Sequence, residues 1–311
     1  MTAPALVWQL RERAIILDRP FVLGILNVTP DSFSDGGSFV SADAAAAHVE
    51  RLLADGANGI DVGGESTRPG AAPVDAAAEI RRVAPVVERL RRAHPDMLLS
   101  VDTVKAEVAR AALDAGADVV NDVSGFRLDP RMGQIVAAAR AGAILMHSRG
   151  TVAEMATYVH ASYGADVTAE VGDELQEAVD RAVAAGVARE ALVVDPGIGF
   201  GKRSEHSLRV LGELSRLVER LGRPLLVGVS RKRFVGEITG EPVPAARAAG
   251  SVGAAVAALV AGARLFRVHD VQLHRQALDV AWAVARSGMM EHHATPPASI
   301  DATSLENQAP A

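Results

Sequence analysis

Short apolar runs alternate with amphipathic stretches along most of the chain. The runs are rich in leucine or β-branched residues, and their length is that of a buried strand, roughly four to eight residues. The stretches between them, for example 44–56, 77–93 and 103–116, place apolar residues at helical spacing. This alternation predicts eight strands, each followed by a helix. The strands are expected at 21–28, 59–63, 97–102, 118–123, 143–147, 191–196, 224–229 and 263–268.

Continuous apolar strands are typical of a parallel sheet that is buried on both faces. Eight strand–helix units favour an α/β fold, a single-domain (β/α)8 TIM barrel over residues 21–290. Residues 6–19 precede the first of these strands, and within an N-terminal unit of residues 1–20 they predict a short hairpin that closes the barrel floor. The polar segment 291–311 contains proline and no periodicity, so it is predicted to be a disordered tail.

A doubly wound sheet is the alternative fold. It would need a glycine-rich dinucleotide-binding turn after the first strand, and NVTPDSF (27–33) does not provide one. The paired glycines in 61–71 lack the G-x-G-x-x-G spacing.

Composition excludes several classes of protein. The chain has no cysteine, which rules out disulfides, thiolate metal sites and a cysteine nucleophile and favours a cytoplasmic location. A net charge of −6 argues against nucleic-acid binding, so any bound anion must meet a local group of cations. The first residues do not form a signal peptide, and no run approaches the roughly 20 apolar residues of a membrane span. The most apolar segment, 250–263, is rich in alanine and broken by glycines, which favours a packed helix.

Polar residues stand at the ends of the predicted strands. In a TIM barrel these carboxyl ends form one rim, where the active site lies. Charged groups at a buried rim are costly unless they are paired, so the pattern predicts function rather than stability. The residues, in strand order, are Asn27, Asp61, Asp102, Asn121 with Asp122, His147, Asp195, the segment 230–232, and Arg267 with His269.

The rim residues divide into two chemical sets. Acceptors, an amide and a cation suit the donor–acceptor edge of a heterocycle, and this set is Asp102, Asn121, Asp195 and Lys232. The cationic or hydrogen-bonding residues that suit an anion are Arg68, Arg267 and His269. Transition-metal spacing such as H-E-x-x-H is absent, whereas an oxygen-liganded Mg²⁺ remains open.

Several of these residues also have structural interpretations. Asp61 and Asp122 are equally consistent with holding loops in shape, and His147 with a framework role. Asp270 is expected to be the N-cap of the last helix.

Eight ordered sequence blocks resemble the dihydropteroate synthase family, over about residues 21–287. They include GILNVTPDSFSDGG (24–37), DVGGESTRPGA (61–71), DPGIGFGK (195–202), GVSRKRFVG (228–236) and RVHDV (267–271). The resemblance implies transfer of a pterinylmethyl group: 6-hydroxymethyl-7,8-dihydropterin pyrophosphate and p-aminobenzoate condense to 7,8-dihydropteroate, with dissociative loss of pyrophosphate. It also implies Mg²⁺, a role in folate biosynthesis and a homodimer formed through the helices near the last strands.

Site residues follow from the resemblance by position. The implied pterin-binding residues are Asp102, Asn121, Met146, Asp195, Gly228, Lys232 and Arg267. The implied pyrophosphate-binding residues are Asn27, Arg68, Arg267 and His269, with Asn27 also reaching the metal. The implied p-aminobenzoate-binding residues are Phe33, Thr67, Pro69, Phe200 and Arg233. The implied catalytic residues are Asp35, Arg68, Asp102, Lys232, Arg267 and His269, and the loop that carries Phe33 and Asp35 is expected to cover the substrates.

Three rival functions fit the sequence less well. A methyltetrahydrofolate methyltransferase-like pterin barrel shares the acids but has no use for the cations Arg68, Arg267 and His269. A non-catalytic paralogue would tolerate loss of Asn27, Arg68 or Lys232, which are all present. A phosphate-sugar barrel usually has glycines where this chain has SRK and RVH. Arg233 stands where many members of the family have serine, which affects only the p-aminobenzoate side.

Overall fold

Eight parallel strands form one sheet in the computed structural model, which describes residues 6–11, 13–28, 38–66 and 72–291. Each strand pairs in parallel with the next, in the order β8-β7-β6-β5-β4-β3-β10-β9. The strands are β3 (Phe21–Asn27), β4 (Gly59–Gly63), β5 (Leu98–Asp102), β6 (Val119–Asp122), β7 (Gly142–Met146), β8 (Leu192–Asp195), β9 (Leu226–Val227) and β10 (Leu265–Val268).

The two edges of this sheet meet and close it into a barrel. Val194 in β8 forms a parallel bridge with Leu225, next to β9, and its N–H donates to the carbonyl of Pro224 at 3.0 Å. The predicted (β/α)8 barrel is therefore confirmed. The last but one strand is shorter than the predicted 224–229, because Pro224 has no N–H to donate to a ladder and the chain turns out of the barrel after Val227.

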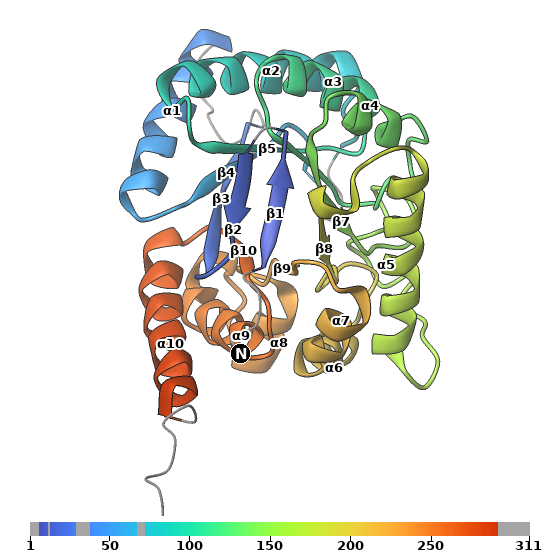
Figure 1. The fold of residues 1–311 in the computed structure, drawn as a ribbon, viewed down its shortest axis with the longest axis vertical. Coiled ribbons are helices and arrows are strands. Elements are labelled where there is room, and N and C mark those ends of the chain that lie inside the picture. The colour runs from blue at the N-terminus through green and yellow to red at the C-terminus, as the bar shows by residue number, and fades with distance from the viewer. Residues whose placement is uncertain (1–5, 12, 29–37, 67–71, 292–311) are drawn as a thin grey trace, which may run out of the picture.

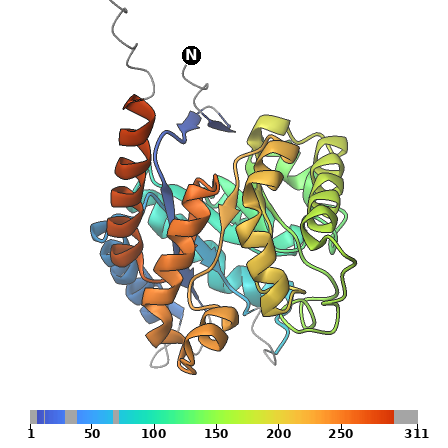
Figure 2. The same ribbon diagram turned by 90° about the horizontal axis from the view of Figure 1, so that it is seen from below.

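An antiparallel hairpin covers one end of the barrel, as the sequence predicted. It consists of β1 (Val7–Leu10) and β2 (Arg13–Ile16). The side chains of Trp8 and Leu10 are fully buried among apolar residues from the strands, and the Trp8 indole N–H donates to the Ala191 carbonyl at 2.9 Å. In Figure 1 the hairpin lies across the centre of the ring of helices, and in Figure 2 it lies at one end of the barrel.

Helices surround the strands in chain order (Figure 1). Local signals explain their starts: α2, for example, begins after Asp75, whose side chain accepts from the Ala78 N–H at 2.7 Å. The helices are α1 (Ser38–Ala54), α2 (Ala76–Ala93), α3 (Ala106–Asp114), α4 (Met132–Ala138), α5 (Val167–Ala184), α6 (Ser204–Gly212), α7 (Leu214–Leu221), α8 (Arg233–Thr239), α9 (Ala248–Val260) and α10 (Val271–Glu291).

The apolar segment 250–263 forms most of α9, which packs against α10. Within the described ranges, no single helix is long and apolar enough to cross a membrane. Two helical segments joined by a bend, Arg233–Thr239 and Pro244–Val260, are together long and apolar enough for a span by length and composition alone. Beyond Glu291, the tail predicted to be disordered lies outside the residues that the structure describes.

Candidate active site

The carboxyl ends of the barrel strands bring the predicted rim residues together. Because the strands are parallel, all of these ends lie at the same mouth, opposite the hairpin. The strands or the segments directly after them supply Asn27 (β3), Asp102 (β5), Asn121 (β6), Met146 (β7), Asp195 (β8), Gly228 and Lys232 (after β9), and Arg267 and His269 (β10).

Arg267 is held by two carboxylates inside the mouth. Its Nε donates to Asp61 Oδ2 at 2.5 Å, and its Nη2 donates to Asp102 Oδ2 at 2.7 Å. Asp61 is completely buried, so Arg267 is its compensating charge. Burial raises the pKa of Asp102 above its ordinary value, and the Arg267 guanidinium opposes that rise.

Asn121 is oriented by the same buried aspartate. Its Nδ2 donates to Asp61 Oδ2 at 3.0 Å. A carboxylate in an ion pair only accepts hydrogen bonds, so the amide nitrogen must face Asp61 and the amide oxygen is left for a ligand. Asp61 therefore positions two predicted pterin-binding residues, Asn121 and Arg267. The sequence left its role open, although an aspartate in the middle of the apolar strand GIDVG was a signal for a buried partner.

Asp195 presents a buried carboxylate at the end of β8. Its Oδ1 accepts from the Gly197 N–H at 2.7 Å, which fixes the carboxylate plane. Burial raises the pKa of Asp195 to about 6, while the Gly197 N–H and the Lys232 ammonium oppose the rise. Met146, opposite Asp195 in the β7–β8 ladder, belongs to an apolar cluster that the ring of Phe200 also contacts.

Lys232 lies over the face of Phe200, with its Nζ 3.9 Å from the ring centroid. Burial lowers the pKa of Lys232 to about 8, against the pull of Asp195. The residue before it, Arg231, has a left-handed φ of 59°, a strained conformation that is frequent at functional sites. Apart from its chain neighbours, no heavy atom of the described residues lies within 4 Å of where a Cβ of Gly228 would stand, so a ligand can approach that backbone closely.

His269 is fixed by Ser230. Both its backbone N–H and its Nδ1 lie within hydrogen-bond distance of Ser230 Oγ, at 3.2 and 3.1 Å. Asp270, expected to be the N-cap of the last helix, directly precedes α10, and its carbonyl accepts from the His274 N–H at 3.2 Å. Its carboxylate pairs with the guanidinium of Arg231, whose Nε donates to Asp270 Oδ2 at 3.0 Å.

Asp122 and His147, for which the sequence also allowed structural roles, have such roles in the structure. Asp122 is fully buried, and its Oδ1 accepts from both the N–H and the hydroxyl of Ser124 at 2.7 Å. His147 is also buried, and its Nδ1 lies 2.7 Å from the Nζ of Lys202. Lys202 was not identified from the sequence; a lysine that directly follows the glycine-rich GIGFG was the available signal.

Asn27, the predicted metal contact, has few possible co-ligands among the protein side chains. In the described part of the chain, no group of three or more His, Asp or Glu residues could hold a metal. A point at the Cβ position of Gly63 lies 3.7 Å from Asn27 Oδ1 and 3.8 Å from Asp102 Oδ2. One or two oxygen ligands of this kind suit a Mg²⁺ that takes its other ligands from phosphates and water.

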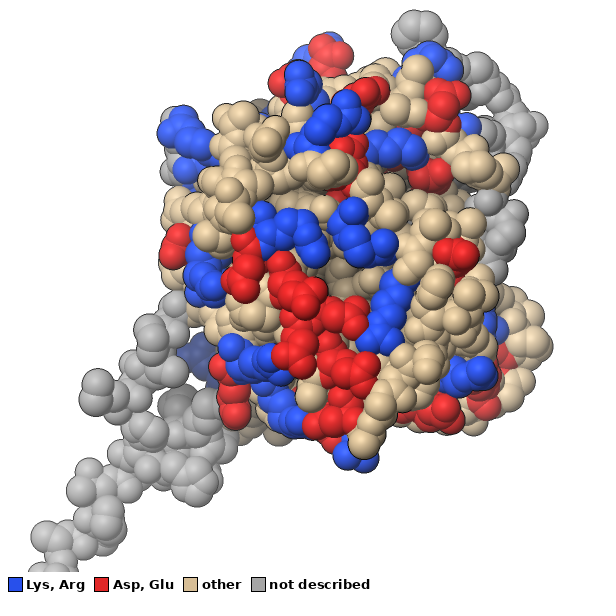
Figure 3. All heavy atoms as spheres, turned by 90° about the vertical axis from the view of Figure 1, so that its right-hand side faces the viewer, with Lys and Arg blue, Asp and Glu red and all other residues tan. Residues whose placement is uncertain are grey.

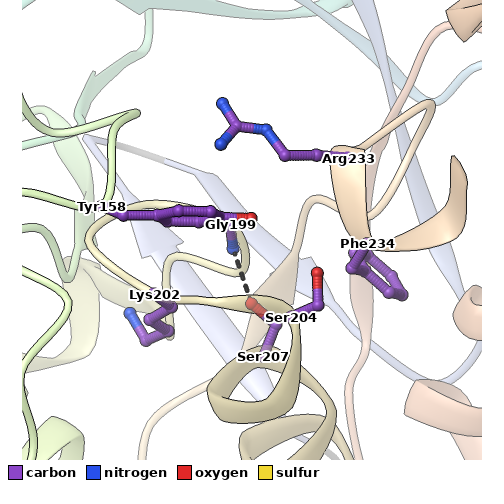
Figure 4. A pocket seen from close by; sticks show the side chains of 7 residues that line it. All are labelled: Tyr158, Gly199, Lys202, Ser204, Ser207, Arg233 and Phe234. Atoms are coloured by element: carbon purple, nitrogen blue, oxygen red, sulfur yellow. Dashed lines mark hydrogen bonds between the residues drawn. The ribbon is translucent and has the colours of Figure 1, made fainter. Parts of the chain in front are cut away.

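Arg233 lies at the edge of a small pocket beside the loop 197–201 (Figure 4). Its guanidinium carbon is 4.7 Å from the ring centroid of Tyr158, and its Nη2 donates to the Ala156 carbonyl at 3.3 Å. The structure thus gives Arg233 protein partners, and its contact with p-aminobenzoate stays a prediction.

Five predicted residues lie outside the described part of the chain: Phe33, Asp35, Thr67, Arg68 and Pro69. Hydrogen bonds hold the residues on either side of segment 67–71. Glu65 Oε1 accepts from the Val74 N–H at 2.8 Å, and Glu65 Oε2 accepts from Lys105 Nζ at 2.7 Å. Lys105 also pairs with the fully buried Glu79, at 2.5 Å.

Acidic side chains dominate part of the outer surface. Figure 3 shows a band of Asp and Glu, bordered by Lys and Arg, on the face that α5 forms. Arg149 pairs there with Glu170 and Glu174, and Arg220 with Asp173. These acidic side chains are thus paired with arginines of the same surface.

The chain is similar to proteins of one family along most of its length. Residues 23–269 match the model of a family described as pterin binding enzyme. The chain is 46% identical over 273 residues to a dihydropteroate synthase of Mycobacterium leprae, an alignment that covers 86% of this chain and 94% of that protein.

Solved structures give the same picture. The Xanthomonas albilineans dihydropteroate synthase with 4-aminobenzoic acid superposes with a TM-score of 0.82 at 46% identity, covering 94% of this chain and all of that one. The structure of the enzyme from the same organism in complex with 7,8-dihydropteroate has a TM-score of 0.79 at 43% identity, with 93% of this chain and 100% of that chain covered.

Proposed function

The chain belongs to the dihydropteroate synthases of the pterin-binding enzyme family, and from this premise and the site we propose the reaction that it catalyses. It condenses 6-hydroxymethyl-7,8-dihydropterin pyrophosphate with p-aminobenzoate to give 7,8-dihydropteroate and pyrophosphate. The observation that carries the proposal is the barrel mouth, where buried carboxylates, an oriented amide and two cations converge.

The pterin binds in the mouth through its polar edge. The carboxylate of Asp195 accepts two parallel N–H bonds from the aminopyrimidine edge, and the amide oxygen of Asn121 accepts another. Lys232, held over Phe200, supplies a donor for the carbonyl oxygen or a ring nitrogen. Arg267 stacks on the ring face because its guanidinium plane is fixed by two carboxylates.

The pyrophosphate leaves toward the cations of the rim. Arg267 and His269 neutralise charge on the leaving group, which lowers the barrier to its departure. His269 is pre-oriented by Ser230 and needs little reorganisation to donate a hydrogen bond. Asn27 would hold Mg²⁺ together with the pyrophosphate oxygens, and the ion would supply further charge neutralisation at the leaving group.

The departure of pyrophosphate leaves positive charge on the methylene carbon, conjugated with the pterin ring. The carboxylates of Asp102 and Asp195 stabilise that charge, which favours a dissociative displacement. The aryl amine of p-aminobenzoate then attacks the methylene carbon and loses a proton. This amine is weakly basic, so positioning matters more than general-base catalysis, and the mechanism uses no enzyme nucleophile.

A pterin barrel that transfers a methyl group is the second candidate. It would use the same acids but no leaving-group cations, and here Arg267 and His269 stand together on β10 and the residue after it. The pairing of Arg267 with two carboxylates favours a site that meets both the pterin and an anion.

Pyrophosphate release tests the proposed reaction. We expect purified protein to release pyrophosphate only when dihydropterin pyrophosphate, p-aminobenzoate and Mg²⁺ are all present, with dihydropteroate formed in equal amount. Chelation of Mg²⁺ by EDTA should lower the rate by about 10²-fold or more, because the charge of the leaving group is then neutralised less well. Folded protein that forms no dihydropteroate would refute the function, and an EDTA-insensitive rate would refute the metal.

We propose a homodimer through α9 and α10. These helices pack on each other and expose apolar side chains: Val260, Leu273, Val280 and Val284 are 74%, 47%, 65% and 66% exposed. Sedimentation equilibrium should give twice the monomer mass for the wild type. The double substitution Val280→Asp and Val284→Asp should give the monomer mass with the fold retained; a monomeric wild type would contradict the proposal. The cytoplasmic location stays a prediction.

A further inference from the structure

A buried ammonium lies behind the loop that follows Asp195. Lys202 is 1% exposed, and its Nζ has three hydrogen-bond acceptors: the carbonyl of Gly197 at 3.1 Å, the carbonyl of Phe200 at 3.2 Å and His147 Nδ1 at 2.7 Å. An ammonium group has three N–H donors, so each one is matched. Burial lowers the pKa of His147 to about 4, so its neutral ring can accept the bond at Nδ1.

The surroundings of Lys202 make it a costly group to keep. Burial lowers the pKa of Lys202 to about 7, while the charges of Asp195 and Glu174 favour the ammonium and those of Arg149 and Lys232 disfavour it. Glu174 comes from α5, and its Oε2 lies 3.1 Å from His147 Nε2 on the far side of the imidazole. An unpaired ammonium here would be expensive, so the three matched acceptors make its presence possible.

The loop 197–201 is rich in glycines whose backbone conformations other residues rarely adopt. Gly197, Gly199 and Gly201 have left-handed φ values of 64°, 79° and 56°. A Cβ on Gly197 would stand 1.9 Å from the His147 carbonyl oxygen, so no other residue fits there. Such a sequence is flexible when unfolded, and contacts must order it in the native state.

Those contacts come from every side of the loop. Asp195 accepts from the Gly197 N–H, and Ser207 Oγ accepts from the Gly199 N–H at 3.2 Å, as Figure 4 shows. On the outer side, the Gly201 N–H donates to the Met155 carbonyl at 2.6 Å, and Gly201 O accepts from Tyr163 OH at 3.0 Å. Lys202 adds hydrogen bonds to two carbonyls of the loop, those of Gly197 and Phe200.

Phe200 is the loop residue that reaches the site. Its N–H donates to the Gly197 carbonyl at 3.0 Å, and its own carbonyl accepts from Lys202, so both backbone groups of Phe200 are fixed by the same arrangement. Its ring lies under Lys232 and against the apolar cluster that contains Met146. A shift of this backbone would therefore move the ring that contacts both Lys232 and the Met146 cluster.

We propose that Lys202 is a positioning residue for p-aminobenzoate, acting through Phe200. The inference rests on the proposed function, because it takes the ring of Phe200 as a wall of the p-aminobenzoate pocket. Lys202 is 1% exposed and its three N–H donors are bound within the protein, so it acts through the loop. Its loss should affect p-aminobenzoate much more than the pterin, because the pterin partners Asn121 on β6 and Arg267 on β10 are held by Asp61, away from the loop.

The substitution Lys202→Met removes the three donors and keeps the length of the side chain. We expect the KM for p-aminobenzoate to rise about tenfold, and the KM for dihydropterin pyrophosphate to change by less than about threefold. Arg91→Met is the matched control, because Arg91 also binds several backbone carbonyls (Gly116, Pro95 and Met97), but at the opposite end of the barrel. That variant should lose thermal stability and keep both KM values.

A double-mutant cycle separates positioning from general damage. Phe200→Ala alone should raise the KM for p-aminobenzoate, and adding Lys202→Met should raise it no further, because the two residues act as one unit. Should Lys202→Met not fold, as judged by circular dichroism, Lys202→Gln replaces it. Its amide keeps two N–H donors, and the same selective rise of about threefold is expected.

The outcomes are distinct. No dihydropteroate from the wild type refutes the proposed function itself. A working wild type combined with a folded Lys202 variant whose p-aminobenzoate KM is unchanged refutes the positioning role alone. Equal changes in both KM values, or an effect of Lys202→Met that persists in the Phe200→Ala background, also overturn it, because Lys202 would then act elsewhere.

Discussion

Replacing Arg267 by methionine is expected to lower kcat/KM by about 10³-fold or more, because the group that meets both the pterin and the leaving group is lost. The same change should lower the free energy of unfolding by about 3–5 kcal/mol, since breaking a buried ion pair leaves an uncompensated charge. The uncompensated charge is that of Asp61, which is 0% exposed and bonds Arg267 at 2.5 Å. Denaturant unfolding and initial rates measure the two effects.

A second substitution tests the cause. Asp61→Asn in the Arg267→Met background removes the orphaned charge and should restore part of the stability, but none of the activity. Arg231→Met is the control for stability, because its pair with Asp270 is partly exposed (31% and 17%) and should contribute only about 1 kcal/mol or less. An Arg267→Met protein as stable as the wild type would contradict the stabilising role given to the Arg267–Asp61 pair.

The loss of stability in Arg267→Met should depend on pH. Burial raises the pKa of Asp102, and without Arg267 nothing opposes that rise as strongly. A carboxyl whose pKa is raised on folding destabilises the protein at pH values above that pKa, and the penalty disappears as protonation neutralises it. The stability difference between Arg267→Met and the wild type should therefore be largest above neutral pH and shrink as the pH falls through the raised pKa.

The fold was predictable because its signals are local. Buried parallel strands read as apolar runs, and the helices between them carry their own periodicity. Once the strands are parallel, topology alone places residues such as Asn27 and Asp195 at one mouth, although they are far apart in the sequence. The length of β9 was overestimated, although Pro224 at its predicted start cannot donate to a ladder and was visible in the sequence.

The partnerships inside the site were not predictable in this way. Arg267 and Asp61 are 206 positions apart, and the sequence does not say which carboxylates a cation chooses. Asp270 is a second example. It directly precedes α10, yet its carboxylate pairs with Arg231, 39 positions earlier in the sequence. The Lys202 scaffold depends on contacts between the segments that follow β7 and β8, so only the residue types, and not their contacts, could be read from the chain.

Asp195→Asn should weaken binding of dihydropterin pyrophosphate by about 10²-fold, because hydrogen bonds to a charged group contribute about 1.5–3 kcal/mol. Asparagine keeps an oxygen that can accept the Gly197 N–H, so this variant removes the charge while the loop stays in place. Asp195→Ala removes both and should also impair p-aminobenzoate through Phe200. Isothermal titration calorimetry measures the affinity of each variant for the pterin substrate.

The pH profile gives an independent reading of the same carboxylate. Its pKa in the free protein is raised to about 6 by burial, and the ionised form is the one that accepts two N–H bonds. For the wild type, kcat/KM for the pterin substrate should therefore fall as the pH drops below about 6, and this acid limb should be absent in Asp195→Asn. Wild-type affinity in Asp195→Asn, or an acid limb that survives the substitution, would place the pterin edge against another carboxylate of the mouth, with Asp102 next to be tested.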